Sequence, residues 1–346
     1  MATAKISNTG LGDFENLLAG IDTAGLGISP YALRYLQHII GHKKFYIRLY
    51  AHVLGLVLAN CPKAKENICL IDYGAGNGLL GLLAKHCGFG KVYINDISPV
   101  FIDAAKKLSV AIGVSPDGFI DGGIEAVKDY SFAHKPDAVA STDVLEHIYN
   151  LEIFFKSVSE INPAMVTVMN TASNPANYFK VRKLKKMQLK DEYEGGQPGD
   201  HALFGETAHG SFLSMRKKII KEYAEGKLSQ EEINKLATLS RGLQKKDIEA
   251  AVEKYLTEKI LPQLIAHPTN TCDPITGSWT ERVLSFDEYR SIYSSAGFTV
   301  GFYDGLYNEF EGGFKSSLPA FANWLVQFAS HRLSPSITLV GKRKED

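Results

Sequence analysis

The chain has 346 residues, of which 45% are hydrophobic and 22% are charged. This composition is ordinary for a globular protein that buries a core. Its 38 Lys and Arg residues balance its 38 Asp and Glu residues, so the net charge is zero. The balance argues against a nucleic-acid partner, such as duplex DNA, that is held mainly through its phosphates.

The sequence shows no targeting or membrane-spanning segment. The N-terminal stretch carries acids, and the longest apolar run near it, residues 53–59, is far shorter than the roughly 20 residues that span a membrane. The cysteines have no disulfide-framework spacing and stand at positions 61, 69, 87 and 272. We therefore expect a cytoplasmic protein with reduced thiols and no membrane partner.

Helical signals dominate the first 66 residues. Ser29 and Pro30 have the pattern of an N-cap followed by proline at the first helical position, and apolar residues then recur at helical spacing. Gly41 is expected to end that helix, and a second helix is predicted over residues 43–59. Residues 1–66 are therefore predicted to form a helical N-terminal extension.

From residue 67 the pattern changes to alternating strands and helices. Short apolar strands are predicted at 68–73, 91–95, 118–120, 137–141 and 165–169, with two more at 298–303 and 337–341. Helix-length segments separate them, which is typical of a buried, doubly wound parallel sheet with right-handed crossovers. We predict an α/β core formed by residues 67–169 and 284–346.

The stretch between these two parts, residues 170–283, has no convincing strand. It contains a capping box at Ser229 and Glu232 and a further predicted helix over residues 246–260. We predict that it is a helical insertion that caps the active face and selects the substrate.

The sequence ICLIDYGAGNGLLG, residues 68–81, predicts a strand, a tight turn and the start of a helix. It can be interpreted in two registers. Gly76, Gly78 and Gly81 match the dinucleotide fingerprint G-x-G-x-x-G, but that strand should run almost directly into the first glycine. In the other register, Asp72 ends the strand and is followed by alternating Gly74, Gly76 and Gly78.

The second register resembles motif I of the class I S-adenosylmethionine-dependent methyltransferases. Asp96 after the second strand, Asp121 after the third and "STDVLEHI" (141–148) after the fourth fit the same pattern, the last one resembling the ubiquinone-biosynthesis methyltransferases. The resemblance implies a Rossmann-like sheet of seven strands with the last one antiparallel. It also implies S-adenosylmethionine as the cofactor.

The resemblance assigns roles to residues at the strand ends. Asp72 would take up the ammonium end of the cofactor, Asp96 the ribose hydroxyls and Asp121 the adenine amino group. The cofactor-binding set implied in this way comprises Asp72, Tyr73, Gly74, Ala75, Gly76, Gly78, Asp96, Ile97, Asp121, Gly122, Thr142 and Asp143. Gly81 is expected to be a glycine that packs the helix against the sheet.

The methyl acceptor is less well defined by the sequence. Base-modifying amino-methyltransferases carry an Asn/Asp-Pro-Pro-Tyr-like motif after strand four, and "TDVLEH" stands there instead. We expect a small-molecule or metabolite acceptor, with oxygen favoured and nitrogen or carbon open, and no metal. Glu146 and His147 are expected to start a helix, whose first turn favours an acid. His147 is the candidate general base, with a structural role as the alternative. Candidate substrate contacts in the insertion are Tyr178, His201 and His209.

Three questions stay open at this point. The basic stretch from Lys180 to Lys190 can be a solvated helix face or can capture an anionic group on the substrate. An NAD(P)-dependent oxidoreductase and a non-catalytic cofactor-binding module remain the alternative functions. The oligomeric state is not indicated.

Overall fold

The computed structural model describes residues 6–195, 210–309 and 314–344. The chain divides into two compact units. The first comprises Met1–Leu145, Asn150–Asn177 and Ser285–Asp346, and the second Glu146–Tyr149 and Tyr178–Leu284. Compactness thus groups the N-terminal helices with the sheet, and it begins the second unit near residue 178.

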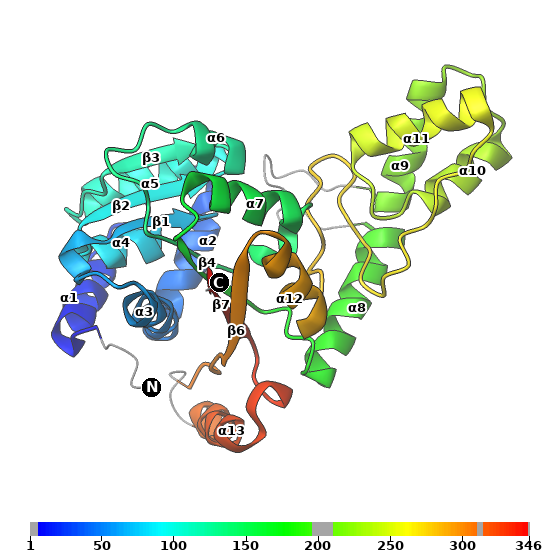
Figure 1. Cartoon of the computed structure of the whole chain (residues 1–346). Coiled ribbons are helices and arrows are strands. Elements are labelled where there is room, and N and C mark those ends of the chain that lie inside the picture. The colour runs from blue at the N-terminus through cyan, green and yellow to red at the C-terminus, as the bar shows by residue number, and fades with distance from the viewer. Residues whose placement is uncertain (1–5, 196–209, 310–313, 345–346) are drawn as a thin grey trace. The chain divides into compact units, whose positions relative to one another are not determined.

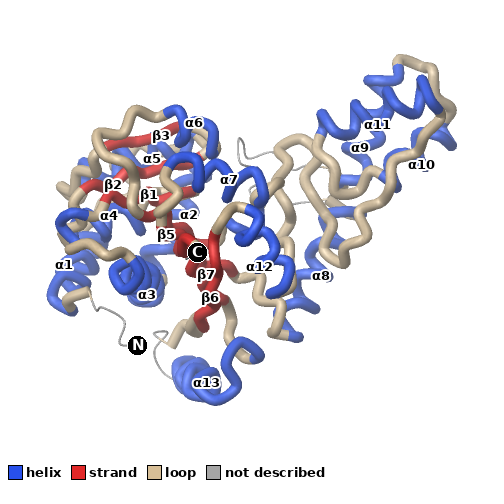
Figure 2. Tube along the Cα trace, viewed as in Figure 1, coloured by secondary structure: helices blue, strands red, loops and turns tan. Residues whose placement is uncertain are grey.

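A seven-stranded sheet with the order β3-β2-β1-β4-β5-β7-β6 forms the centre of the first unit (Figure 2). Strands β1 to β5 are parallel to one another, and β7 runs antiparallel to both β5 and β6. The strands are β1 (Cys69–Tyr73), β2 (Lys91–Asp96), β3 (Gly118–Asp121), β4 (Ala138–Thr142), β5 (Val166–Thr171), β6 (Phe298–Asp304) and β7 (Ile337–Arg343). The prediction of a doubly wound sheet with an antiparallel last strand is confirmed, and each strand end lies within two residues of its predicted position.

Helices cover both faces of this sheet (Figure 1). The crossovers place α4 (Leu79–His86) against β1 and β2 and α5 (Pro99–Ala111) against β2 and β3, while α6 (Ile124–Asp129), α7 (Leu151–Ile161) and α12 (Phe286–Ser295) pack together. We expected a helix to start at Glu146 and His147. That expectation was wrong: Leu145–His147 is a 3-10 turn, and α7 starts later because the Asn150 side chain caps it by accepting from the Ile153 amide at 2.9 Å.

The N-terminal helices are part of the core of the first unit. They are α1 (Asn8–Ala19), which the sequence did not reveal, α2 (Pro30–Gly41), capped by Ser29 as predicted, and α3 (Lys43–Asn60). Helix α3 packs against β4, β5 and β7, and its Val53 and Leu54 are fully buried. Burial of each side chain of this size contributes roughly 1.5–3 kcal/mol, so the packing of α3 on the sheet stabilises the first unit.

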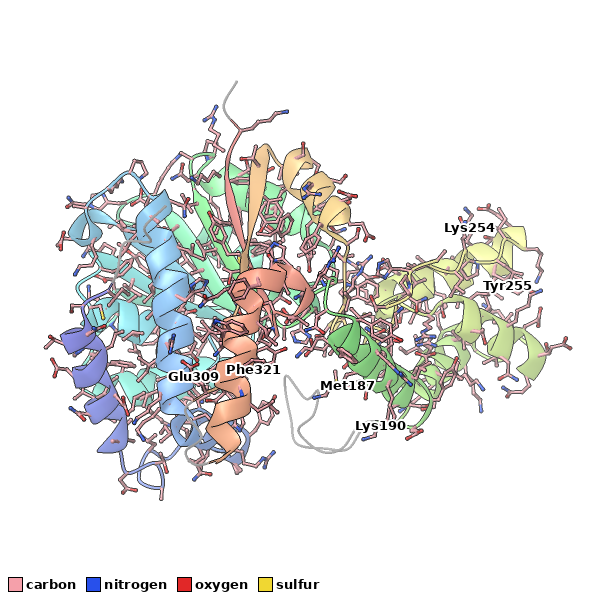
Figure 3. The ribbon with its side chains drawn as sticks, turned by 90° about the horizontal axis from the view of Figure 1, so that it is seen from below. Met187, Lys190, Lys254, Tyr255, Glu309 and Phe321 are labelled. Carbon is pink, nitrogen blue, oxygen red and sulfur yellow. The ribbon has the colours of Figure 1, made fainter. Side chains whose placement is uncertain are left out.

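At the other end of the first unit lies α13 (Phe314–Ala329), which follows β6. The segment before it is tied to α3, because the Glu309 carboxylate accepts from the Arg48 guanidinium and from the Asn323 amide at 2.9 Å. Figure 3 labels Glu309, which lies in this segment, and Phe321, which lies in α13. Segments from both ends of the chain therefore contact each other within the first unit.

The helices of the second unit are followed by an irregular segment, residues 260–284, which contains an isolated bridge between Cys272 and Trp279. The helices are α8 (Tyr178–Tyr193), which carries Met187 and Lys190, and α9 (Phe212–Ala224), α10 (Gln230–Leu239) and α11 (Lys245–Glu258), which carries Lys254 and Tyr255 (Figure 3). Arg216 is fully buried and donates to the Glu192 carboxylate and to the Ala237 carbonyl. The predicted capping box opens α10. Within the described ranges, no helix is both long and apolar enough to cross a membrane.

The turn that joins β1 to α4 depends on its glycines. Gly74, Gly76 and Gly78 have φ angles of +63°, +53° and +79°, in the left-handed region. A Cβ on Gly74 would lie 2.6 Å from Cγ2 of Val144, so the loop after β4 packs directly against this turn. Glycine is needed here for backbone conformation and for space.

We predict that Gly74→Ala lowers the free energy of unfolding by about 2–4 kcal/mol, because left-handed backbone strain and the clash with Val144 add together. Gly113→Ala is the matched control, since Gly113 has a φ of +67° and open space around it, and it should cost only about 1–2 kcal/mol. Urea unfolding followed by circular dichroism measures both. Equal losses for the two variants would contradict the packing of Val144 against the turn.

Candidate functional site

Asp72 is a buried carboxylate at the carboxyl end of β1. Its side chain is 2% exposed, and Oδ2 accepts a hydrogen bond from the Gly81 amide at 2.8 Å. Burial raises its pKa to about 7; the Gly81 bond opposes this shift, and the nearby Asp96 charge adds to it. The protein thus holds an acid that gains from a cation placed beside it.

Asp96 ends β2 and fastens the glycine turn to the neighbouring strand. It is 5% exposed; Oδ2 accepts from the Gly76 amide and Oδ1 from the Ser98 amide, each at 2.8 Å. Burial raises its pKa to about 6 against the effect of these two bonds, and the charge of Asp121 raises it further. Among the described residues, neither Asp96 nor Asp72 has an ion-pair partner.

Gly81 lies at the contact between α4 and the sheet and does not line the site. A Cβ there would lie 3.0 Å from Cγ1 of Ile94 and 3.1 Å from Oδ2 of Asp72. The glycine therefore lets α4 approach the sheet closely enough for its amide to reach Asp72. This is the helix-to-sheet packing expected for Gly81 in the register that starts at Asp72.

The parallel register brings the other predicted residues to the same edge of the sheet. Asp121 lies opposite Asp96 in the β2–β3 pair, and the Asn95 side chain secures the turn after β3 by donating to the Ile120 and Gly122 carbonyls at 3.0 and 2.8 Å. Gly122 has a φ of +124°. Asp121 is exposed, and Ile97 is half exposed.

The end of β4 completes this edge. Thr142 is partly buried, and the exposed Asp143 takes a φ of +53°, with its amide donating to the Asn170 carbonyl at 3.0 Å. In the turn after β1, the Ala75 amide donates to the Asn95 carbonyl at 2.9 Å. The Tyr73 ring packs against Phe154, with the ring centroids 4.9 Å apart. The described structure thus gathers all the residues predicted to bind the cofactor.

Helices α2 and α3 bring tyrosines to this edge that sequence reasoning missed. The atoms nearest to a Cβ placed on Gly76 all belong to the Tyr35 ring, with Cε1 at 3.0 Å. The charge of Asp143 raises the pKa values of Tyr35, Tyr46 and Tyr50, in each case after burial as the largest cause. The available signal was the i, i+4 spacing of Tyr31 with Tyr35 and of Tyr46 with Tyr50, which places each pair on one helix face.

Of the predicted catalytic and substrate residues, His147 and Tyr178 belong to the second unit. Nδ1 of His147 donates a hydrogen bond to the Trp279 carbonyl at 2.8 Å, since a carbonyl can only accept, and in the neutral ring this makes Nε2 the acceptor nitrogen. Potential ligand atoms of Glu146, His147 and Glu281 lie within 4.8 Å of one another, the one such group found in the described part of the chain. Tyr178 is 68% exposed at the start of α8. His201 and His209 lie outside the described residues.

The residues at the strand ends fit an adenosyl sulfonium compound. S-adenosylmethionine carries an ammonium group, a sulfonium group and two ribose hydroxyls. Asp72 and Asp96 are buried carboxylates with no cation paired to them in the described structure, and such groups gain from a cation or from hydroxyl donors. The chemistry of these acids, and not the glycines alone, favours this cofactor over a pyrophosphate-containing dinucleotide.

Comparison with known proteins agrees with this chemistry. Residues 42–197 match the family model of a methyltransferase domain. Over 64 residues the chain is 39% identical to the ribosomal protein L11 methyltransferase of Burkholderia mallei, a match that covers 17% of this chain and 21% of that protein. The match thus spans about a fifth of the length of the curated relatives.

Solved structures with a similar chain path include two S-adenosylmethionine-dependent methyltransferases. One, a putative enzyme of Listeria monocytogenes, has 13% identity and a TM-score of 0.42, with 85% of this chain and 99% of that chain covered. The other, from Clostridium acetobutylicum, has 10% identity and a TM-score of 0.42, with 86% and 92% covered. The family match over residues 42–197, the sheet order and the acids at the strand ends together identify a class I methyltransferase domain within this chain, with S-adenosylmethionine as its cofactor.

Proposed function

We propose that the protein transfers a methyl group from S-adenosylmethionine to a small-molecule or metabolite acceptor, with oxygen as the favoured acceptor atom. The observation that carries the proposal is the pair of buried carboxylates: Asp96 accepts from the Gly76 amide of the glycine turn, and Asp72 accepts from the Gly81 amide of α4. In this proposal Asp72 holds the ammonium end of the cofactor and Asp96 its ribose hydroxyls, with Asp121 toward the adenine.

The cofactor supplies the electrophile, since its sulfonium makes the methyl carbon open to in-line attack. The protein has to orient the acceptor, exclude water and, for a hydroxyl acceptor, take away one proton. His147 is our candidate for that proton transfer, because its Nδ1 donates to the Trp279 carbonyl and in the neutral ring Nε2 can then accept a proton. Tyr178, His201 and His209 are candidate acceptor contacts, and the basic stretch from Lys180 to Lys190 is a candidate site for an anionic group on the acceptor.

A protein acceptor is the second candidate. It is supported by the local similarity to enzymes named for methylation of a ribosomal protein. We favour a small molecule because the similarity covers about a fifth of those enzymes.

The proposal is tested by incubating the protein with S-adenosylmethionine labelled in the methyl group and a cell extract separated into small-molecule and protein fractions. We expect label in the small-molecule fraction. Label in the protein fraction alone would replace our acceptor class by the second candidate. Cofactor binding without any transfer would indicate a non-catalytic binding module.

We predict that Asp96→Ala weakens binding of S-adenosylmethionine by about 1.5–3 kcal/mol, the scale of hydrogen bonds to a charged group, which is roughly 10- to 150-fold in Kd. Isothermal titration calorimetry measures the change. Asp103→Ala is the matched control, because Asp103 is an exposed acid on α5 that is paired with Lys107. An unchanged Kd for Asp96→Ala would mean that the carboxylate does not face the cofactor.

We also predict that cofactor binding strengthens as the pH rises from 5.5 to 8. The raised pKa values of about 7 for Asp72 and about 6 for Asp96 leave these acids largely protonated at the lower pH, and a cationic ligand favours their ionised forms. The Kd should fall at least about ten-fold across this range, with proton release near pH 7 visible as a buffer-dependent binding enthalpy. Asp72→Asn should flatten the profile. A pH-independent Kd of the unaltered protein would contradict the assignment.

A further inference from the structure

The N-terminal helices place an aromatic ring against the glycine turn. Cε1 of Tyr35 lies 3.0 Å from the position that a Cβ on Gly76 would take, so the ring occupies the space that this glycine leaves open. The Gly76 amide is at the same time held by Asp96 at 2.8 Å. The Tyr35 ring therefore packs against the glycine turn at Gly76, and the same glycine is hydrogen-bonded to the Asp96 carboxylate.

Two contacts hold this ring in place. The Tyr35 ring meets Phe101 of α5 edge to face, with centroids 5.5 Å apart and an interplanar angle of 63°. One turn earlier in α2, the Ala32 carbonyl accepts a hydrogen bond from the Asn77 side chain at 3.1 Å, which ties the helix to the glycine turn. The ring is thus positioned by the same elements that position the acids.

The surroundings of this ring favour positive charge. Protein atoms crowd the Tyr35 hydroxyl, but 41% of the surface of the residue remains exposed, so part of the side chain is open to an incoming ligand. The carboxylates of Asp96 and Asp143 are close enough to act on its hydroxyl. Aromatic faces carry negative potential and attract cations, most strongly where water is displaced.

We propose that Tyr35 contacts the cofactor through its ring and recognises the positive charge of the sulfonium. This inference rests on the proposed function, because it takes S-adenosylmethionine as the ligand. It makes α2 part of the binding site and gives the protein a way to distinguish the cofactor from its neutral, demethylated product, S-adenosylhomocysteine. The product keeps the ammonium, the ribose and the sulfur, but it lacks the methyl group and the positive charge on the sulfur. Comparing the two ligands therefore measures the interaction of Tyr35 with that charge.

Calorimetric titration of both ligands tests the proposal. We expect Tyr35→Leu to weaken S-adenosylmethionine about ten-fold and S-adenosylhomocysteine less than about three-fold, in keeping with the loss of one cation–π contact. Tyr35→Phe keeps the ring and should leave both Kd values within about three-fold. Tyr31→Leu is the matched control, since Tyr31 packs on the same Phe101, with centroids 5.4 Å apart, one turn away.

A fluorinated series separates the charge interaction from a loss of folding. Phenylalanines of increasing fluorination at position 35 retain the size of the ring and weaken its negative face. Affinity for S-adenosylmethionine should fall along the series while that for S-adenosylhomocysteine stays constant. Equal losses for both ligands, or no loss for either, would overturn the role of Tyr35. If the unaltered protein bound neither ligand, the proposed function itself would fail.

Discussion

Burial of two carboxylates without a paired cation is the constraint on which the site depends. Asp72 and Asp96 have each been removed from water at a cost that backbone amides offset only in part, and both pKa values are raised as a result. The same acids hold the left-handed glycine turn and the start of α4 in place, because they accept from the amides of Gly76 and Gly81. A cationic ligand offsets the free-energy cost of burying these carboxylates. The burial of the acids therefore favours a cationic cofactor.

The sheet and the cofactor-binding edge could be predicted from the sequence because short-range patterns determine them. Apolar runs bounded by turn residues locate the strands to within two residues, and acids that directly follow parallel strands must meet at one edge. Asp72, Asp96 and Asp121 could be placed in this way without any knowledge of side-chain packing.

Other features could not be predicted because they depend on contacts between distant segments. Tyr35 is adjacent to Gly76 only after α2 has docked beside the glycine turn, and nothing in residues 30–41 indicates that partner. The start of α7 was misplaced because the helix begins where the Asn150 side chain caps it, after the turn that holds Glu146. His147 lies in the second compact unit, and its proposed role as a base rests on its hydrogen bond to the Trp279 carbonyl and on the chemistry of imidazole.

The central claim is that the acids at the strand ends bind an adenosyl sulfonium cofactor and not a dinucleotide. The most direct measurement is a calorimetric titration of the full chain with S-adenosylmethionine and, separately, with NADH. The account predicts saturable binding of S-adenosylmethionine and no binding of NADH. Binding of NADH without binding of S-adenosylmethionine would contradict it.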